Sequence, residues 1–299
     1  MTESVRLTVP PVFTHNSFEY FLGQLPEGLS AGGCCVFDFR VVTGMTAFGV
    51  LSLLILCETL SSLGIKVSVD SRDNQPVKDM LAQWGFSQFF PQEEGAVSGQ
   101  GHSSRIVLPI TPIQGEQDVY EVISALRDSI PMSPRQATDL VVVVSEIAQN
   151  IMEHSSAKGY IAVGRHRRRA RQDMVDICVA DGGVGMGQSL KEKLAYVDRR
   201  YLDSFAIYKA LYEGLSRHDE PGRGNGIVKT RELVRKHGGR LSLRSGRAKI
   251  WGTVSFWQIE RVLKKQLCFL PGTQVHIEFP LSRELPQYAE ELNLDTSPA

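Results

Sequence analysis

The stretch that decides the fold is Glu146-Ile-Ala-Gln-Asn-Ile-Met-Glu-His154. Two glycine-rich stretches follow it along the chain, Asp181-Gly-Gly-Val-Gly-Met186 and Gly222-Arg-Gly-Asn-Gly226. Each stretch alone is a weak signal, because short glycine-containing motifs are common in turns. On a helix, the acid, amide and imidazole of the first stretch lie four residues apart and share one face. Such a face is either solvated or part of a site.

A single helix is predicted from Ser133 to about His154. Its start combines a serine cap, a proline in the first turn and a glutamine three residues after the cap. The run Val141–Val144 could be a strand in isolation. The apolar positions continue to Ile151, however, and this length favours a helix.

The two glycine-rich stretches lie at the ends of predicted elements. An apolar strand is predicted over Asp176–Ala180, and Asp181 follows at its end. Gly183 and Gly185 allow the backbone to pass close to a ligand without a Cβ clash, although a bare tight turn is the alternative. The stretch 222–227 is predicted to begin a helix, where free backbone N–H groups can bind phosphate.

Taken together and in this order, the three stretches resemble the N, G1 and G2 boxes of the Bergerat-fold ATP site. This site defines the GHKL superfamily of gyrase, heat-shock chaperone, histidine kinase and mismatch-repair ATPases. The resemblance covers roughly residues 115–281 and implies ATP and Mg²⁺ as ligands. It predicts an α/β sandwich in which a mixed sheet is covered by helices on one face.

The chemistry of the side chains agrees with the roles that the resemblance implies. Asn150 offers a neutral oxygen to Mg²⁺, and Glu146 can accept a proton from an attacking water or hydroxyl. Asp181 can accept a hydrogen bond from the exocyclic amine of adenine. His154 is similar to the trailing histidine of anti-sigma serine/threonine kinases and is expected to support the site. The full set of expected nucleotide-binding positions is Asn150, Asp181, Gly183, Gly185, Met186, Gly222, Arg223, Gly224, Asn225, Gly226 and Thr273.

The remaining parts of the expected domain follow the same resemblance. Residues 191–221 are expected to form a lid over ATP, with a helix near Phe205–Leu215. Strands are predicted at Arg240–Arg244 and Gln274–Phe279 from their alternation. Thr273, in Pro271-Gly-Thr273, matches a Gly-Thr motif that helps to bind adenine, and an exposed turn threonine is the alternative.

The front part of the chain alternates predicted strands and helices. Strands are predicted at 34–39 and 65–69, and helices from about Thr46 to Gly64 and from Asp73 onward, which indicates a small sheet with helices packed on it. Residues 5–90 resemble STAS domains of anti-anti-sigma factors. Thr46 falls on the phosphoryl-acceptor position of that family, but the usual acid and glycine are absent, so Thr46 is expected to cap a helix.

The STAS-like part is expected to recruit or regulate rather than to catalyse. Asp38 is predicted to lie in the middle of a strand, and no cluster of titratable residues is expected there. The polar, glycine-rich segment 92–104 indicates a linker. The predicted division is a regulatory domain with linker at 1–104, an ATP-binding domain at 105–285 and a polar tail at 286–299.

Bulk composition limits the range of partners. The formal net charge is zero, with 33 basic and 33 acidic residues, which argues against a general attraction to nucleic acid or anionic membrane. The longest apolar run, Val50–Cys57, is too short to span a bilayer, and the N-terminus lacks a secretory pattern. A cytoplasmic protein with reduced cysteines is expected. The basic run Arg165–Arg171 indicates a solvated hairpin loop, with a phosphate or nucleic-acid contact as the alternative.

Three functions stay open at this level. The chain can be a regulatory protein of the anti-sigma serine/threonine kinase type, which acts on a protein partner or on another copy of itself. It can be a GHKL ATPase in which water is the acceptor and nucleotide works a conformational switch. It can also be a nucleotide sensor with negligible turnover. Kinase and ATPase need the same base, Glu146, so the sequence does not separate them.

Overall fold

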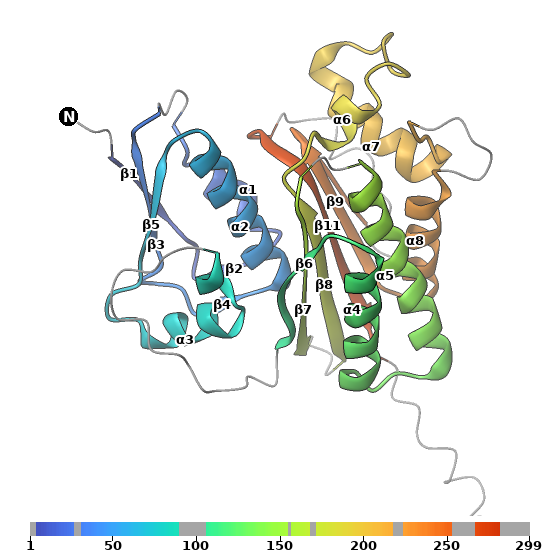
Figure 1. The fold of residues 1–299 in the computed structure, drawn as a ribbon, viewed down its shortest axis with the longest axis horizontal. Coiled ribbons are helices and arrows are strands. Elements are labelled where there is room, and N and C mark those ends of the chain that lie inside the picture. The colour runs from blue at the N-terminus through green and yellow to red at the C-terminus, as the bar shows by residue number, and fades with distance from the viewer. Residues whose placement is uncertain are drawn as a thin grey trace, which may run out of the picture.

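A computed structural model describes residues 4–26, 31–89, 106–154, 157–167, 172–217, 224–252 and 267–281, apart from the side chains of Glu153 and His154. Figure 1 shows a smaller N-terminal unit beside a larger unit in which helices cover a sheet. The predicted domain boundaries fall outside the described residues and stay predictions. Within the described ranges, no helix has the length and apolar character that a membrane span requires.

The larger unit is built on a six-stranded sheet with the order β10-β9-β11-β8-β7-β6. Its strands are β6 (Ile106–Ile113), β7 (Gly159–Arg167), β8 (Asp173–Asp181), β9 (Arg240–Gly246), β10 (Ala248–Gly252) and β11 (Leu270–Pro280). Every neighbouring pair is antiparallel, so the expected mixed sheet is wrong. Part of the reason is that β7–β8 and β9–β10 are consecutive hairpins, and a short hairpin joins only antiparallel strands.

Four long helices lie against one face of this sheet (Figure 1). They are α4 (Glu116–Ser129), α5 (Pro134–His154), α7 (Leu202–Glu213) and α8 (Asn225–Lys236), and the shorter elements α6 (Gly185–Ser189) and η2 (Arg199–Tyr201) precede α7. The expected start of α5 is confirmed, because the Gln136 backbone N–H donates to Ser133 Oγ at 3.2 Å. The Gln136 side chain donates to the Pro280 carbonyl at 3.0 Å, which ties α5 to the end of β11.

The N-terminal unit confirms the expected alternation of strands and helices. Its parallel sheet has the order β1-β3-β5, and a two-stranded ribbon joins β2 and β4. The elements are β1 (Ser4–Thr8), β2 (Val12–Phe13), α1 (Phe18–Leu22), β3 (Cys34–Asp38), β4 (Gly44–Met45), α2 (Ala47–Ser62), β5 (Lys66–Asp70), α3 (Gln75–Gln83) and η1 (Phe86–Gln88). All five cysteines are free; Cys35, Cys57 and Cys178 are buried, whereas Cys268 is exposed.

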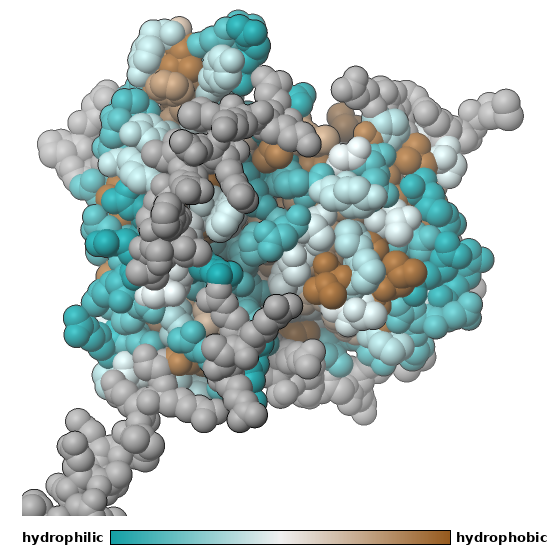
Figure 2. Space-filling view, turned by 180° about the vertical axis from the view of Figure 1, so that it is seen from behind, coloured by the Kyte–Doolittle hydropathy of each residue, from teal (hydrophilic) through white to brown (hydrophobic). Residues whose placement is uncertain are grey.

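Helix α2 lies between the two sheets. It is apolar on all sides over its first three turns, and every residue from Ala47 to Cys57 is buried, as a helix packed on both faces requires. Its core includes Tyr160, Ala162, Cys178 and Ala180 from the six-stranded sheet. Within the larger unit the helices cover one face of the sheet, as expected, and α2 of the N-terminal unit packs on the other face. On the face that Figure 2 shows, the coloured surface is mostly hydrophilic, with apolar groups in small separate areas.

Polar contacts fix the N-terminal end of α2 against the sheet. The Ala47 backbone N–H donates to Asp176 Oδ2 at 2.9 Å, and Asp176 also pairs with His276. Burial raises the pKa of Asp176, but His276 and the Ala47 N–H outweigh burial and hold that pKa below its usual value. Thr46 caps the helix, since its Oγ1 accepts from the Gly49 N–H at 3.2 Å, which confirms the expected cap.

The parallel sheet carries a charge cluster that the sequence reasoning missed. Asp38 ends β3 instead of lying in its middle, and the parallel register places it opposite Asp70. Arg6 contacts both carboxylates, at 3.2 and 2.7 Å. Arg40 and Arg72 each bind their nearer aspartate. The expected absence of clustered titratable groups is therefore wrong, because parallel strands bring their carboxyl ends to one edge.

Candidate functional site

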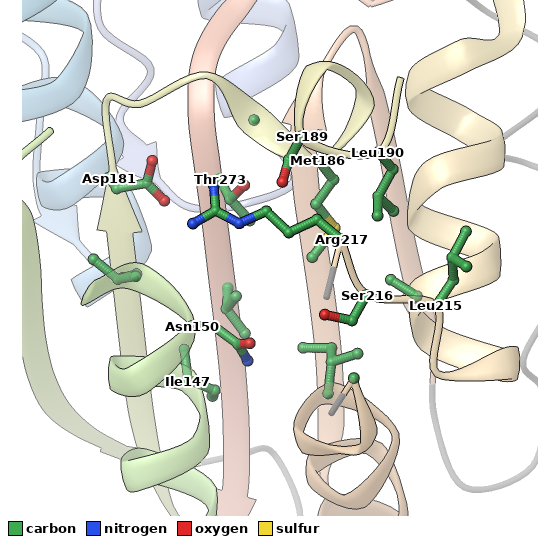
Figure 3. A pocket seen from close by; sticks show the side chains of 16 residues that line it. Ile147, Asn150, Asp181, Met186, Ser189, Leu190, Leu215, Ser216, Arg217 and Thr273 are labelled. Atoms are coloured by element: carbon green, nitrogen blue, oxygen red, sulfur yellow. The ribbon is translucent and has the colours of Figure 1, made fainter. Parts of the chain in front are cut away.

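A pocket opens between the helical layer and one end of the six-stranded sheet (Figure 3). Its walls come from α5, the turn and helix after β8, the segment after α7, the start of α8, and β11. The lining residues are Ile147, Asn150, Ile151, Asp181, Gly185, Met186, Ser189, Leu190, Ala210, Leu215, Ser216, Arg217, Gly224, Ile227, Thr273 and Val275. Most of the lining is apolar and only a few polar groups converge there, which is the usual character of a small-molecule site.

Asp181 is the most deeply buried acid of this pocket. It ends β8, is 4% exposed, and accepts a hydrogen bond from the Gly183 N–H at 2.7 Å. Burial raises its pKa to about 6, while the backbone N–H groups of Gly183 and Thr273 oppose that rise. A carboxylate in such a place is costly unless it receives a donor, so Asp181 is suited to bind a ligand N–H.

Close backbone approach shapes the wall beside Asp181. Gly272 has φ +77°, and a Cβ on it would collide with the Asp181 carbonyl. Gly185, at φ +75°, would place a Cβ 2.8 Å from Ser245 Oγ. Only glycine combines these left-handed conformations with so little space.

Ser245 joins two sides of the pocket and was missed by the sequence reasoning. Its Oγ accepts from the Met186 N–H at 2.8 Å, donates to the Gly272 carbonyl at 3.0 Å, and lies 3.2 Å from Thr273 Oγ1. The serine thus connects the first glycine-rich turn to the Gly-Thr motif. No local motif surrounds it, and its partners are distant in sequence, so no short-range signal would have identified it.

Helix α5 presents the second polar group of the pocket. Asn150 points into the cavity (Figure 3), which Ile147 and Ile151 of the same helix also line. Glu146 lies one turn earlier on the same face, 3.4 Å from Lys229 Nζ of α8. Its Oε2 would lie only 2.6 Å from a Cβ on Gly226, so α8 passes close to the Glu146 carboxylate.

The start of α8 forms the end of the pocket opposite Asp181. Gly224 is the N-cap, at φ +86°, and packs so closely on Gly214 that a Cβ would collide with the Gly214 carbonyl. Asn225 is exposed at the first helical position, and Ile227 adds an apolar wall. The first backbone N–H groups of an α-helix have no partner within the helix, and they attract anions.

The segment after α7 covers part of the pocket. Leu215, Ser216 and Arg217 line it, and Arg217 reaches across the opening toward the side of Asp181 and Thr273 (Figure 3). The helix expected in the lid is present as α7, which ends at Gly214 with φ +66°. The remaining lid positions 218–221 lie outside the described residues.

The structure brings together many of the residues expected from sequence. Asn150, Asp181, Gly185, Met186, Gly224 and Thr273 line the pocket. Gly183 does not line the pocket, but its N–H donates to Asp181. Glu146 and Gly226 lie close to each other beside Asn150. Gly222 and Arg223 lie outside the described residues, and so does the side chain of His154. The basic run joins β7 and β8 as expected for a hairpin, but its positions 168–171 are not described.

Residues 135–283 match the family described as Histidine kinase-, DNA gyrase B-, and HSP90-like ATPase. This part of the chain is therefore a HATPase_c domain of the GHKL superfamily, and it contains every residue that lines the pocket. The family match implies ATP as the ligand of this domain.

Two solved structures show weaker similarity. The mycobacterial sensor histidine kinase MprB is 18% identical, covers 57% of this chain and 98% of its own, and has a TM-score of 0.29. The histidine kinase domain of the blue-light activated histidine kinase EL346 from Erythrobacter litoralis is 16% identical, covers 78% and 85%, and has a TM-score of 0.27. No curated protein matches the chain in sequence.

Proposed function

We propose that the chain binds ATP with Mg²⁺ and passes the γ-phosphate to water or to a serine or threonine of a protein partner. The observation that carries this proposal is the buried, strand-ending carboxylate of Asp181 in the wall of a mostly apolar pocket. An adenine ring fills such a slot with its apolar faces, and its exocyclic amine donates to the carboxylate.

The same carboxylate accounts for selectivity between purines. Guanine carries a carbonyl where adenine carries its amine, so guanine would place an acceptor against the Asp181 acceptor. Two buried acceptors without a donor cost about 1–3 kcal/mol, which corresponds to roughly 5- to 150-fold in affinity. ATP is therefore the preferred nucleotide.

The opposite end of the pocket suits the phosphates and the metal. The start of α8 offers backbone N–H groups, and Asn150 offers a carboxamide oxygen in the same place. Mg²⁺ prefers oxygen ligands and usually binds through one or two protein groups together with phosphate oxygens, so this set fits it. When bound, Mg²⁺ neutralises charge that develops on the transferred phosphoryl group.

Glu146 is the candidate general base. It lies on the face of α5 that carries Asn150, one turn away, beside the N-terminal end of α8. From there it can accept the proton of a water or hydroxyl that attacks the γ-phosphate. Phosphoryl transfer to water and to a protein hydroxyl both need this base. Which of the two receives the phosphoryl group therefore depends on which molecule reaches the site.

A nucleotide sensor without turnover is the second candidate. It is favoured by the ion pair in which Lys229 Nζ lies 3.4 Å from Glu146 Oε1. If this pair persists with ATP bound, the carboxylate stays engaged and cannot take a proton efficiently.

The anti-sigma kinase subtype would instead use the N-terminal unit to recruit a partner. The parallel sheet and helices of that unit support the proposed STAS-like assignment. The cytoplasmic location of the protein is a prediction from its sequence.

Incubation of the full chain with γ-labelled ATP and Mg²⁺ separates these possibilities. Label on protein supports the kinase, free phosphate supports the ATPase, and neither product with intact binding supports the sensor. Glu146→Ala is expected to lower turnover by about 10²- to 10⁴-fold and to leave nucleotide binding largely unchanged. Glu121→Ala, on the exposed side of α4, is the matched control. Normal turnover in Glu146→Ala would exclude Glu146 as the base.

A further inference from the structure

The carboxyl end of β9 and the turn after it contact three separate parts of the molecule within four residues. Arg244 contacts the N-terminal unit, and Ser245 contacts the pocket wall. The Arg247 backbone contacts Asp203 of α7, in the expected lid. We refer to residues 244–247 as the β9 end. Neighbouring residues on a strand move together, so a displacement at one of these contacts is passed to the others.

Arg244 depends on Glu19 of α1. The guanidinium is fully buried and contacts the Glu19 carboxylate with two nitrogens, at 3.0 and 3.3 Å. It also donates to the carbonyls of Gly246 and Cys268, at 3.1 and 2.7 Å. Because a buried guanidinium is stable only with a paired charge and satisfied donors, loss of Glu19 would force Arg244 to move.

Ser245 cannot follow such a movement without changing the pocket. Its three short contacts to Met186, Gly272 and Thr273 lie between 2.8 and 3.2 Å. Hydrogen bonds weaken steeply beyond this range, so a shift of about 1 Å would break them. The first glycine-rich turn and the Gly-Thr motif would then lose their common anchor beside Asp181.

The turn after Ser245 reaches the lid helix. The Arg247 backbone N–H donates to Asp203 Oδ2 of α7 at 2.8 Å. Asp203 lies so close to Gly246 and Gly187 that a Cβ on either glycine would collide with its carboxyl group. The lid helix and the first glycine-rich turn therefore pack on the same turn that Arg244 anchors.

We propose that Glu19 of the N-terminal unit is a positioning residue for the nucleotide pocket and acts through Arg244 and Ser245. The N-terminal unit then regulates nucleotide affinity from the far side of the sheet. This proposal rests on the proposed ATP site. It assigns the regulation of that site to a contact between the two units of one chain.

The test measures Mg-ATP affinity of full-length variants with a fluorescent nucleotide. Glu19→Leu is expected to weaken binding at least about fivefold, the lower range of allosteric couplings. Glu19→Gln retains an acceptor for Arg244 without the charge, and an intermediate loss is expected. Tyr160→Phe is the matched control. It removes only the hydroxyl that donates to Glu58 of α2, at 2.5 Å, across the same boundary, and its affinity is expected to stay within about twofold.

Hydrogen exchange on the unaltered chain gives an independent readout that does not need a folded variant. Coupling is reciprocal, so nucleotide must change amide protection in α1, residues 18–22, as well as at the β9 end. Protection changes confined to the pocket walls, or unchanged affinity in Glu19→Leu, would overturn the positioning role. Failure of the unaltered chain to bind Mg-ATP would instead overturn the proposed function, so the two failures are distinguishable.

Discussion

Asp181 lies at a strand end with almost no contact with water, and such burial destabilises the ionised carboxylate. The described structure gives it the backbone N–H groups of Gly183 and Thr273 as donors, while burial still raises its pKa to about 6. A ligand amine would add a donor and stabilise the ionised form. A ligand donor therefore stabilises the ionised form of Asp181 more than it would stabilise that of an exposed aspartate.

This raised pKa predicts a pH dependence of nucleotide binding. The ionised form accepts from the adenine amine, and with a pKa of about 6 only about a tenth of the carboxyl groups are ionised at about pH 5. Affinity for Mg-ATP should therefore rise about tenfold between about pH 5 and pH 7. Calorimetric titrations across this range measure the effect. In Asp181→Asn, the residual binding should lose this component, and an identical pH profile would exclude Asp181 as its source.

The residues of the pocket differ in how visible they are from sequence. Asn150 and Asp181 lie in motifs whose spacing on a helix and at a strand end is recognisable. Ser245 and Arg217 have no such signature, because tertiary contacts and the path of the lid place them in the site. Sequence reasoning therefore located the polar ends of the pocket but not the serine that joins its walls.

Among the elements, α2 illustrates that the sequence pattern predicts the limits of a helix but not the surfaces on which it packs. Its limits were close to the expected ones, since Thr46 and Gly64 mark its ends. Its largely apolar composition fits burial on all sides, but the identity of the second packing surface depends on long-range contacts, and the sequence did not predict it. The antiparallel direction of the six-stranded sheet was also missed, because strand patterns carry little information about the direction of pairing.

The anchor of α2 predicts a specific loss of stability. Asp176 is buried, pairs with His276 and accepts from the first N–H of α2. Asp176→Ala leaves both partners unsatisfied in the interior and should destabilise the chain by about 3–5 kcal/mol. Denaturant unfolding measures this change. Arg167→Ala, which removes an exposed ion pair with Asp173 on the same hairpin, should cost less than about 1 kcal/mol. Equal effects of the two variants would mean that Asp176 does not anchor α2.

For the whole molecule, the two units share one hydrophobic core. Side chains of α2 pack with Tyr160, Ala162, Cys178 and Ala180 of the six-stranded sheet. The sequence predicts a regulatory domain and an ATP-binding domain joined by a linker, and this division stays a prediction. The shared core was not foreseeable from local patterns, since its two halves are about a hundred residues apart in the chain.

A truncated chain that starts at residue 105 should reveal this dependence. It would expose the sheet face that α2 covers, and an apolar surface of this kind promotes aggregation and dye binding. Fluorescence of a hydrophobic dye and sedimentation should show a severalfold increase in binding and self-association. A chain ending at residue 285 is the matched control and should behave like the full chain. A monomeric, dye-free truncation would show that the N-terminal unit is a separate domain.

Calorimetric titration of Mg-ATP into the full chain and into Asp181→Asn tests most directly whether the pocket is an adenine-nucleotide site. One nucleotide should bind per chain, with ATP preferred over GTP. Asp181→Asn should weaken ATP binding by about 1–3 kcal/mol, or roughly 5- to 150-fold, because one carboxylate oxygen becomes an NH2 donor that faces either the Gly183 N–H or the adenine amine. Absence of binding to the full chain, or equal ATP affinity in Asp181→Asn, would contradict the assignment of this pocket.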